Sequence, residues 1–146
     1  MEIRRALPSL TSEQASVIEA IAERKSYTFG ELIIKQGDHP DRLFIMIMGE
    51  GRVTLHKSAT MDADFTSPLG PGELFGELSF VDGQPASASV TADGDTEVIE
   101  IPGPALRELL DNDSALAANV YRDLIQAVAS RLRKANLRII THANLD

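Results

Sequence analysis

The residues best placed to do chemistry lie in one stretch of the chain, residues 71–90. It consists of Pro-Gly-Glu-Leu-Phe-Gly-Glu-Leu-Ser-Phe followed by Val-Asp-Gly-Gln-Pro-Ala-Ser-Ala-Ser-Val. Glycines let the backbone expose its N–H groups, and a turn of helix beginning near Glu77 would add its positive end. Together these groups would form an anion-binding nest. Gly-Glu pairs also occur in ordinary bends of β-sandwich proteins, so the residues alone leave both interpretations open.

Other kinds of site find little support in the sequence. Cysteine is absent, which excludes disulfides, thiol nucleophiles and cysteine-ligated zinc. The histidines, His39, His56 and His142, show no metal-ligand spacing, and the segment 38–41 is typical of a solvated turn. Glu77 lies near serines but has no histidine partner in the pattern. We therefore predict a protein that is not an enzyme and that has no metal site and no cofactor.

The charge is distributed unevenly along the 146 residues. The formal net charge is −8, and residues 58–106 contain nine carboxylates but no Lys or Arg. A nucleic-acid-binding surface needs clustered basic residues, so DNA or RNA is not expected as a direct partner. No apolar run approaches the roughly 18 residues that span a bilayer, and the first residues lack a secretory signal. We expect no membrane partner and a cytoplasmic location.

The element pattern predicts a single domain over residues 1–146. A helix is expected over 11–24, where Thr11 and Gln14 have the spacing of a capping box. Residues 25–101 form short apolar runs bounded by turn signals, which favours an antiparallel jelly-roll β-barrel. The fold class is therefore mainly β with flanking helices.

Helices return over residues 103–140. Pro104 suits the first turn of a short helix, and Asp113 is a suitable N-cap for a long one. An apolar seam on the long helix has alternating spacings of four and three, as in a coiled coil: Tyr121, Ile125, Val128, Leu132, Ala135 and Ile139. Leu116, Val120 and Leu124 widen the apolar face in the first half only. We predict that the first half packs on the barrel and that the seam forms a homodimer. The alternative is that the whole stripe packs within one chain.

Several motifs together resemble a known family. They are Gly30-Glu31, Gly37-Asp38, Gly49-Glu50-Gly51-Arg52-Val53, Phe75-Gly76-Glu77-Leu78 and Ser87-Ala88-Ser89-Val90. In this order and spacing they are similar to the cyclic-nucleotide-binding domain shared by the bacterial catabolite activator and the regulatory subunits of cyclic-AMP-dependent kinase. The resemblance covers about residues 11–140 and implies the same fold, with cyclic AMP or cyclic GMP as the ligand.

The resemblance also implies roles for individual residues. Glu77 would accept a hydrogen bond from the ribose 2′-hydroxyl, with Ser79 in the same turn. The backbone around Gly76, Leu78 and Ala88, with the Ser87 hydroxyl, would hold the cyclic phosphate. The family has an arginine immediately before the small-residue pair, and Ala86 stands at that position here. The phosphate would therefore enter an acidic segment without its usual cation.

Four cations could replace that arginine: Arg52, Lys57, Arg131 and Lys134. Arg131 is the strongest candidate, because in the catabolite activator a helix arginine at about this place lies near the ribose-binding glutamate. The alternative is that Arg131 is a solvated helix charge. Ala135 and Asn136 stand where the catabolite activator has Thr-Ser, so the resemblance implies that Asn136 could hydrogen-bond a purine edge. The alternative is that Asn136 is a surface residue.

The sequence thus supports two functions. The first is a regulatory module that relays cyclic-nucleotide occupancy through its C-terminal helices. The alternative is a degenerate domain that does not bind cyclic nucleotide and serves for dimerisation or protein docking. The winged helix-turn-helix of the DNA-binding relatives would lie beyond Asp146, so no output domain is expected in cis.

Overall fold

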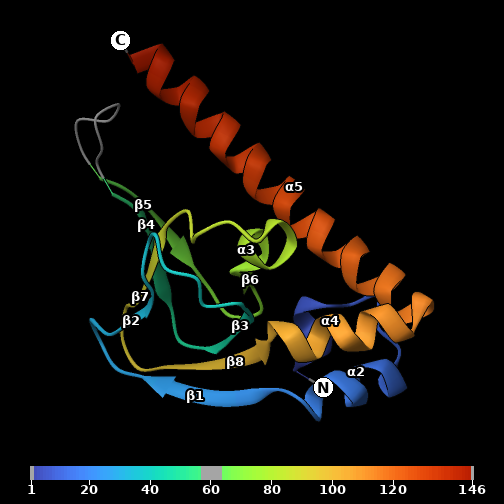
Figure 1. The fold of residues 1–146 in the computed structure, drawn as a ribbon. Coiled ribbons are helices and arrows are strands. Elements are labelled where there is room, and N and C mark those ends of the chain that lie inside the picture. Colours follow the sequence, from blue (N-terminus) through green and yellow to red (C-terminus); the bar gives the residue numbers. More distant parts are fainter. Residues whose placement is uncertain (1, 57–63, 146) are drawn as a thin grey trace.

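The computed structural model describes residues 2–56 and 64–145 (Figure 1). Its helices are α1 (Ile3–Ala6), α2 (Ser12–Glu19), α3 (Glu77–Asp82), α4 (Gly103–Asn112) and α5 (Ser114–Leu145). Its strands are β1 (Glu23–Tyr27), β2 (Leu32–Ile34), β3 (Arg42–Met48), β4 (Gly51–Leu55), β5 (Phe65–Leu69), β6 (Leu74–Phe75), β7 (Ser89–Ala92) and β8 (Thr96–Pro102).

The strands form two antiparallel four-stranded sheets. One has the order β1-β8-β3-β6 and the other β2-β7-β4-β5. The predicted jelly roll is thus confirmed, although the two sheets are not closed into a barrel. Every strand pairing within them is antiparallel.

The central strands β3 and β8 of the β1-β8-β3-β6 sheet are buried on both faces, whereas the edge strand β1 is largely exposed. On β3, Phe44 and Met46 point into the core between the sheets, where Val98 of β8 joins them. Leu43 and Ile45 alternate with them and pack against the helices instead. Successive side chains of a strand point to opposite faces, so a doubly covered strand needs a continuous apolar run. This explains why residues 43–46 are all hydrophobic.

The N-terminal helix is shorter than predicted. The capping box of Thr11 and Gln14 is present, but α2 ends at Glu19 rather than at residue 24. Arg24 pairs with Ile99 of β8, so the cross-strand hydrogen bonds of β1 override the helical pattern. The β-roll accordingly covers residues 23–102 instead of 25–101. The short helix α1, which the sequence pattern did not indicate, buries Ile3 under the other helices.

Two strands were also missed at the sequence level. β5 contains Pro68, and β6 is only two residues long. Both strands lie at a sheet edge, where a proline without an N–H donor is tolerated. β6 is too short to be identified from the sequence, and β5 carries polar residues and a proline between its apolar ends.

The first half of the long C-terminal helix, α5, agrees with the prediction. The Asp113 side chain accepts the N–H of Leu116 at 3.0 Å, as an N-cap does. Leu116, Val120 and Leu124 are buried in the core that lies between the helices and strands β3 and β8. Asp123 is buried as well and accepts the N–H and the hydroxyl of Ser9 at 2.9 and 2.7 Å. α5 then runs past residue 140 and extends diagonally away from the sheets (Figure 1). None of the helices in the described part of the chain is long and apolar enough to cross a membrane.

Candidate functional site

The centre of the site is a sharp turn between β6 and α3. Gly76 adopts φ +75°, a left-handed conformation that side chains with a Cβ rarely adopt. A Cβ at Gly76 would lie 2.7 Å from Cδ2 of Phe44, so the turn also needs glycine for space. Phe44 stacks on Phe75, with ring centroids 5.1 Å apart. The turn is therefore anchored to the core between the sheets, and α3 begins at Glu77 as predicted.

Eight of the nine residues predicted to bind ligand line a single pocket. They are Gly76, Glu77, Leu78, Ser79, Ala86, Ser87, Ala88 and Arg131. Ile34, Val53, Phe75 and Val90 supply apolar walls from both sheets. The fold thus brings the two halves of the 71–90 stretch and one residue of α5 around the same cavity.

Glu77 is the most unusual group in this pocket. It is only 1% exposed, and its Oε1 accepts a hydrogen bond from Nη1 of Arg131, 54 residues away in sequence. Its other oxygen, Oε2, is buried and has no hydrogen-bond partner among the residues that the structure describes. A buried carboxylate oxygen without a donor is costly. The arrangement leaves a strong acceptor for a ligand hydroxyl.

The position of the missing arginine is part of the core. Ala86 is 8% exposed, packs in the core between the sheets and also lines the pocket. Its backbone is fixed on both sides, because its carbonyl accepts the N–H of Gly37 and its N–H donates to the carbonyl of Asp38. Among the described residues that line the pocket, Arg131 is the only cation.

The other candidate residues lie elsewhere. Arg52 is exposed on β4 and does not line the pocket, and Lys57 lies outside the described residues. Lys134 Nζ lies 4.0 Å from Oε1 of Glu73, outside the pocket lining. Asn136 is exposed and does not line the pocket.

Three basic side chains on one face of α5 attach this helix to the rest of the domain. Arg131 contacts Glu77, Lys134 faces Glu73, and Arg138 donates from Nη2 to the carbonyl of Thr66 at 2.7 Å. The Arg138 guanidinium also lies over the ring of Phe65, 3.8 Å from its centroid. Sequence reasoning missed Arg138, although the spacing 131, 134, 138 places all three side chains on one helix face. The second half of α5 is therefore attached through polar contacts.

One triad of side chains was not expected. Nε2 of His56 lies 3.0 Å from Oγ of Ser89, and its Nδ1 lies 3.6 Å from Asp64. Ser89 is only 3% exposed, and its Oγ also accepts the N–H of Gln36 at 2.9 Å. A buried hydroxyl engaged on both sides cannot reach a substrate. The contact therefore ties the residues that follow β2 and β4 to the first residue of β7.

The jelly roll thus places a half-paired buried carboxylate beside a glycine turn, and comparisons with known proteins specify the family. Residues 24–113, more than half of the chain, match the model of the cyclic nucleotide-binding domain. The chain belongs to this family, which confirms the resemblance drawn from the sequence.

Two relatives have the names of regulatory proteins. The chain is 32% identical over 131 residues to the cyclic AMP receptor protein of Thermus thermophilus, covering 89% of this chain and 58% of that protein. It is 33% identical over 94 residues to the cAMP-dependent protein kinase regulatory subunit of Dictyostelium discoideum, covering 61% of this chain and 28% of the subunit. The chain thus spans only part of the length of either relative.

A solved structure shows the same fold. It is a cyclic nucleotide-binding domain from Methylobacillus flagellatus, similar with a TM-score of 0.86 and 24% identity over 96% of this chain and 83% of that one. At this identity the likeness concerns the arrangement of the elements.

The geometry of the turn yields a stability prediction. Gly76→Ala should lower the free energy of unfolding by about 2–4 kcal/mol, because it combines a strained φ with a clash against Phe44. Gly83→Ala is the matched control, since Gly83 also has a positive φ but has no atom within 4 Å of the added Cβ. It should cost only about 1–2 kcal/mol. Urea unfolding measures both, and equal losses would contradict the close packing of the turn.

Proposed function

We propose that this chain is a non-catalytic, cytoplasmic regulatory module that binds a cyclic nucleotide in the pocket around Glu77. The observation that carries the proposal is the buried Glu77 carboxylate, held by Arg131 through one oxygen and unpartnered at the other. A ribose hydroxyl would donate to that free oxygen. Family membership over residues 24–113 supports the same ligand class.

The cyclic phosphate would lie against the backbone around Gly76, Leu78 and Ala88 and the hydroxyl of Ser87. The first N–H groups of a helix have no partner within the helix, which favours a negative ligand at the start of α3. The opposing factor is charge, because the ligand and Glu77 are both anionic. Arg131 is the described cation that lines this pocket, so it would balance the two together.

Occupancy would be relayed through α5. The phosphate competes with Glu77 for the Arg131 guanidinium, and the second half of the helix is held mainly by the basic face 131, 134 and 138. A ligand that binds one position of α5 more tightly than another shifts the equilibrium between them. Asn136 does not line the pocket, so both cyclic AMP and cyclic GMP are suitable ligands to test.

A second function is favoured by the exposed seam of α5. Ile125, Leu132 and Ile139 are exposed in the single chain, so the whole stripe does not pack within one molecule. A helix face with this heptad spacing suits a second copy of the same helix. We propose homodimerisation through this seam, either together with ligand binding or, as the alternative, as the main role of a domain that binds no nucleotide.

Replacing Arg131 tests the binding mode. Arg131→Ala should weaken the binding of cyclic AMP or cyclic GMP by about tenfold or more, because it removes a charge-assisted hydrogen bond and leaves Glu77 without its cation. Calorimetric titration in low-salt buffer measures the affinity. Arg133→Ala is the control, since Arg133 is exposed on the same helix and does not line the pocket. Equal affinities of the two variants would contradict the role of Arg131. No binding by the unmodified protein would favour the docking alternative.

Restoring the family arginine tests whether the backbone and hydroxyl groups proposed to hold the phosphate are still suitable for it. Ala86→Arg should strengthen or create binding of cyclic AMP by about tenfold or more, because a guanidinium would reach the phosphate beside Ser87 and Ala88. The same titration measures the gain, with Gln84→Arg as a control that adds the same charge at an exposed position outside the pocket lining. If Ala86→Arg brings no gain, the loss of this arginine is not the only difference from a binding site.

The seam predicts an oligomeric state. Ile125→Glu with Leu132→Glu should raise the dimer dissociation constant by at least about 100-fold, because two carboxylates would enter an apolar interface. Sedimentation equilibrium measures the change. Leu137→Glu is a matched control, since Leu137 is 64% exposed, close to the 59% of Leu132, but lies on the side of α5 away from the seam. A wild-type monomer at high concentration would overturn the seam proposal.

A further inference from the structure

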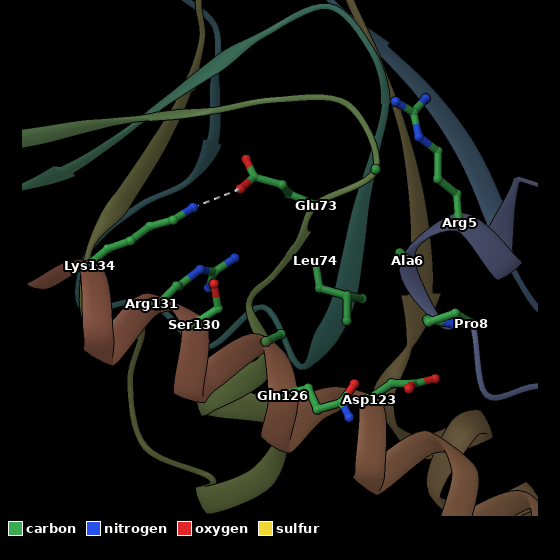
Figure 2. Close-up of a pocket in the computed structure, with 12 residues that line it drawn as sticks. Arg5, Ala6, Pro8, Glu73, Leu74, Asp123, Gln126, Ser130, Arg131 and Lys134 are labelled. Atoms are coloured by element: carbon green, nitrogen blue, oxygen red, sulfur yellow. Dashed lines mark ion pairs between the residues drawn. The ribbon is translucent and has the colours of Figure 1, made fainter.

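A second cleft lies on the other side of the Arg131 side chain. It has a volume of about 290 Å³, whereas the pocket around Glu77, the proposed nucleotide pocket, has about 60 Å³. α1, the turn from Gly72 to Leu74 and the middle of α5 form its walls (Figure 2). Apart from Arg131, none of its lining residues belongs to the nucleotide pocket.

The floor of the cleft is apolar. Leu74 lies in its centre between α5 and α1, with Ala6 and Pro8 on the α1 side (Figure 2). Ala127 of α5 also lines it. Gln126 and Ser130 add polar groups from α5. An apolar floor with a few polar groups is typical of small-molecule sites.

The carboxylates that line the cleft are already engaged. Asp123 is buried, with one oxygen on the N–H of Ser9 and the other on its hydroxyl. Glu73 accepts the N–H of Gly70 through one oxygen and faces Lys134 through the other. Neither is free to bind a cation from solution.

The cations of the cleft include one without a counterion. Within the described residues, Arg5 has no ion pair and no hydrogen bond through its guanidinium. Its side chain lies over Gly72, where an added Cβ would be 2.8 Å from Nε and 3.1 Å from Cδ of Arg5. Gly72 has φ +82°, so this turn both requires glycine and makes room for the arginine. The stem of Arg5 is thus supported at the edge of the cleft while its donors remain available.

We infer that this cleft binds a small organic anion, with its phosphate or carboxylate head at Arg5 and an apolar body over Leu74. An arginine fork matches either head group with two parallel hydrogen bonds. Lys134 and Arg131 on the opposite wall add positive potential. Because Arg131 also pairs with Glu77, a molecule in the cleft lies against the residue that neutralises the nucleotide pocket.

The test is an NMR titration of the full chain with phenyl phosphate, which has a phosphate head on a small apolar ring. Saturable shifts are expected at the amides of Arg5, Gly72 and Gln126 and at Nε of Arg131. Arg5→Ala should weaken binding by about tenfold. Arg4→Ala is the matched control, because it removes the same charge from the adjacent exposed position, which does not line the cleft. It should change the affinity less than about twofold.

Three results would overturn the inference. They are equal losses in Arg4→Ala and Arg5→Ala, equal binding of uncharged benzyl alcohol, and shifts confined to Gly76–Leu78, Ser87 and Ala88. The last would place the phosphate in the nucleotide pocket. Ser87→Ala changes that pocket alone and should leave phenyl phosphate binding intact. The result for the cleft is therefore independent of whether the chain binds a cyclic nucleotide.

Discussion

The ion pair between Glu77 and Arg131 is the interaction on which the rest of the site depends. One partner is almost completely buried at the start of α3, and the other extends from α5. An unpaired buried carboxylate would be strongly unfavourable, so α5 stabilises the pocket by supplying a cation. The same contact connects the pocket to α5 through one pair of side chains.

That pair is positioned by a rigid core. The turn at Gly76 rests on Phe44, and Phe44 belongs to a strand that is buried on both faces. Close-packed side chains cannot shift independently, so the turn presents Glu77 in one orientation. In contrast, the second half of α5 is attached through Arg131, Lys134 and Arg138, which are partly exposed polar contacts. Such contacts are weaker and sensitive to salt. The fold thus combines a turn packed on the core with a helix whose second half is attached through polar side chains.

The two faces of α5 divide its roles. Leu116, Val120 and Leu124 fix the first half to the core, whereas Ile125, Leu132 and Ile139 remain exposed. The basic side chains occupy a separate face that is turned toward the β-sheets and α3. α5 thus has an anchored start, a basic inner face and an exposed apolar face. Arg131 also lines the cleft beside α1, so the cleft and the pocket around Glu77 share this residue of α5.

The sequence by itself determined the jelly roll, the capping box of α2, the Asp113 cap and the residues of the glycine turn, because these depend on local patterns and on motif order. The family resemblance also identified Ala86 as the position where the family has an arginine and this chain does not. The sequence could not decide where α2 ends, since the pairing of Arg24 with Ile99 on β8 is a contact between distant segments. The family resemblance already favoured Arg131 among the candidate cations. Only the tertiary structure placed Arg131 in the pocket lining, kept Arg52, Lys134 and Asn136 out of it, and placed Arg5 over Gly72. Each of these depends on how α5 and α1 are oriented against the sheets. No local sequence pattern determines that orientation.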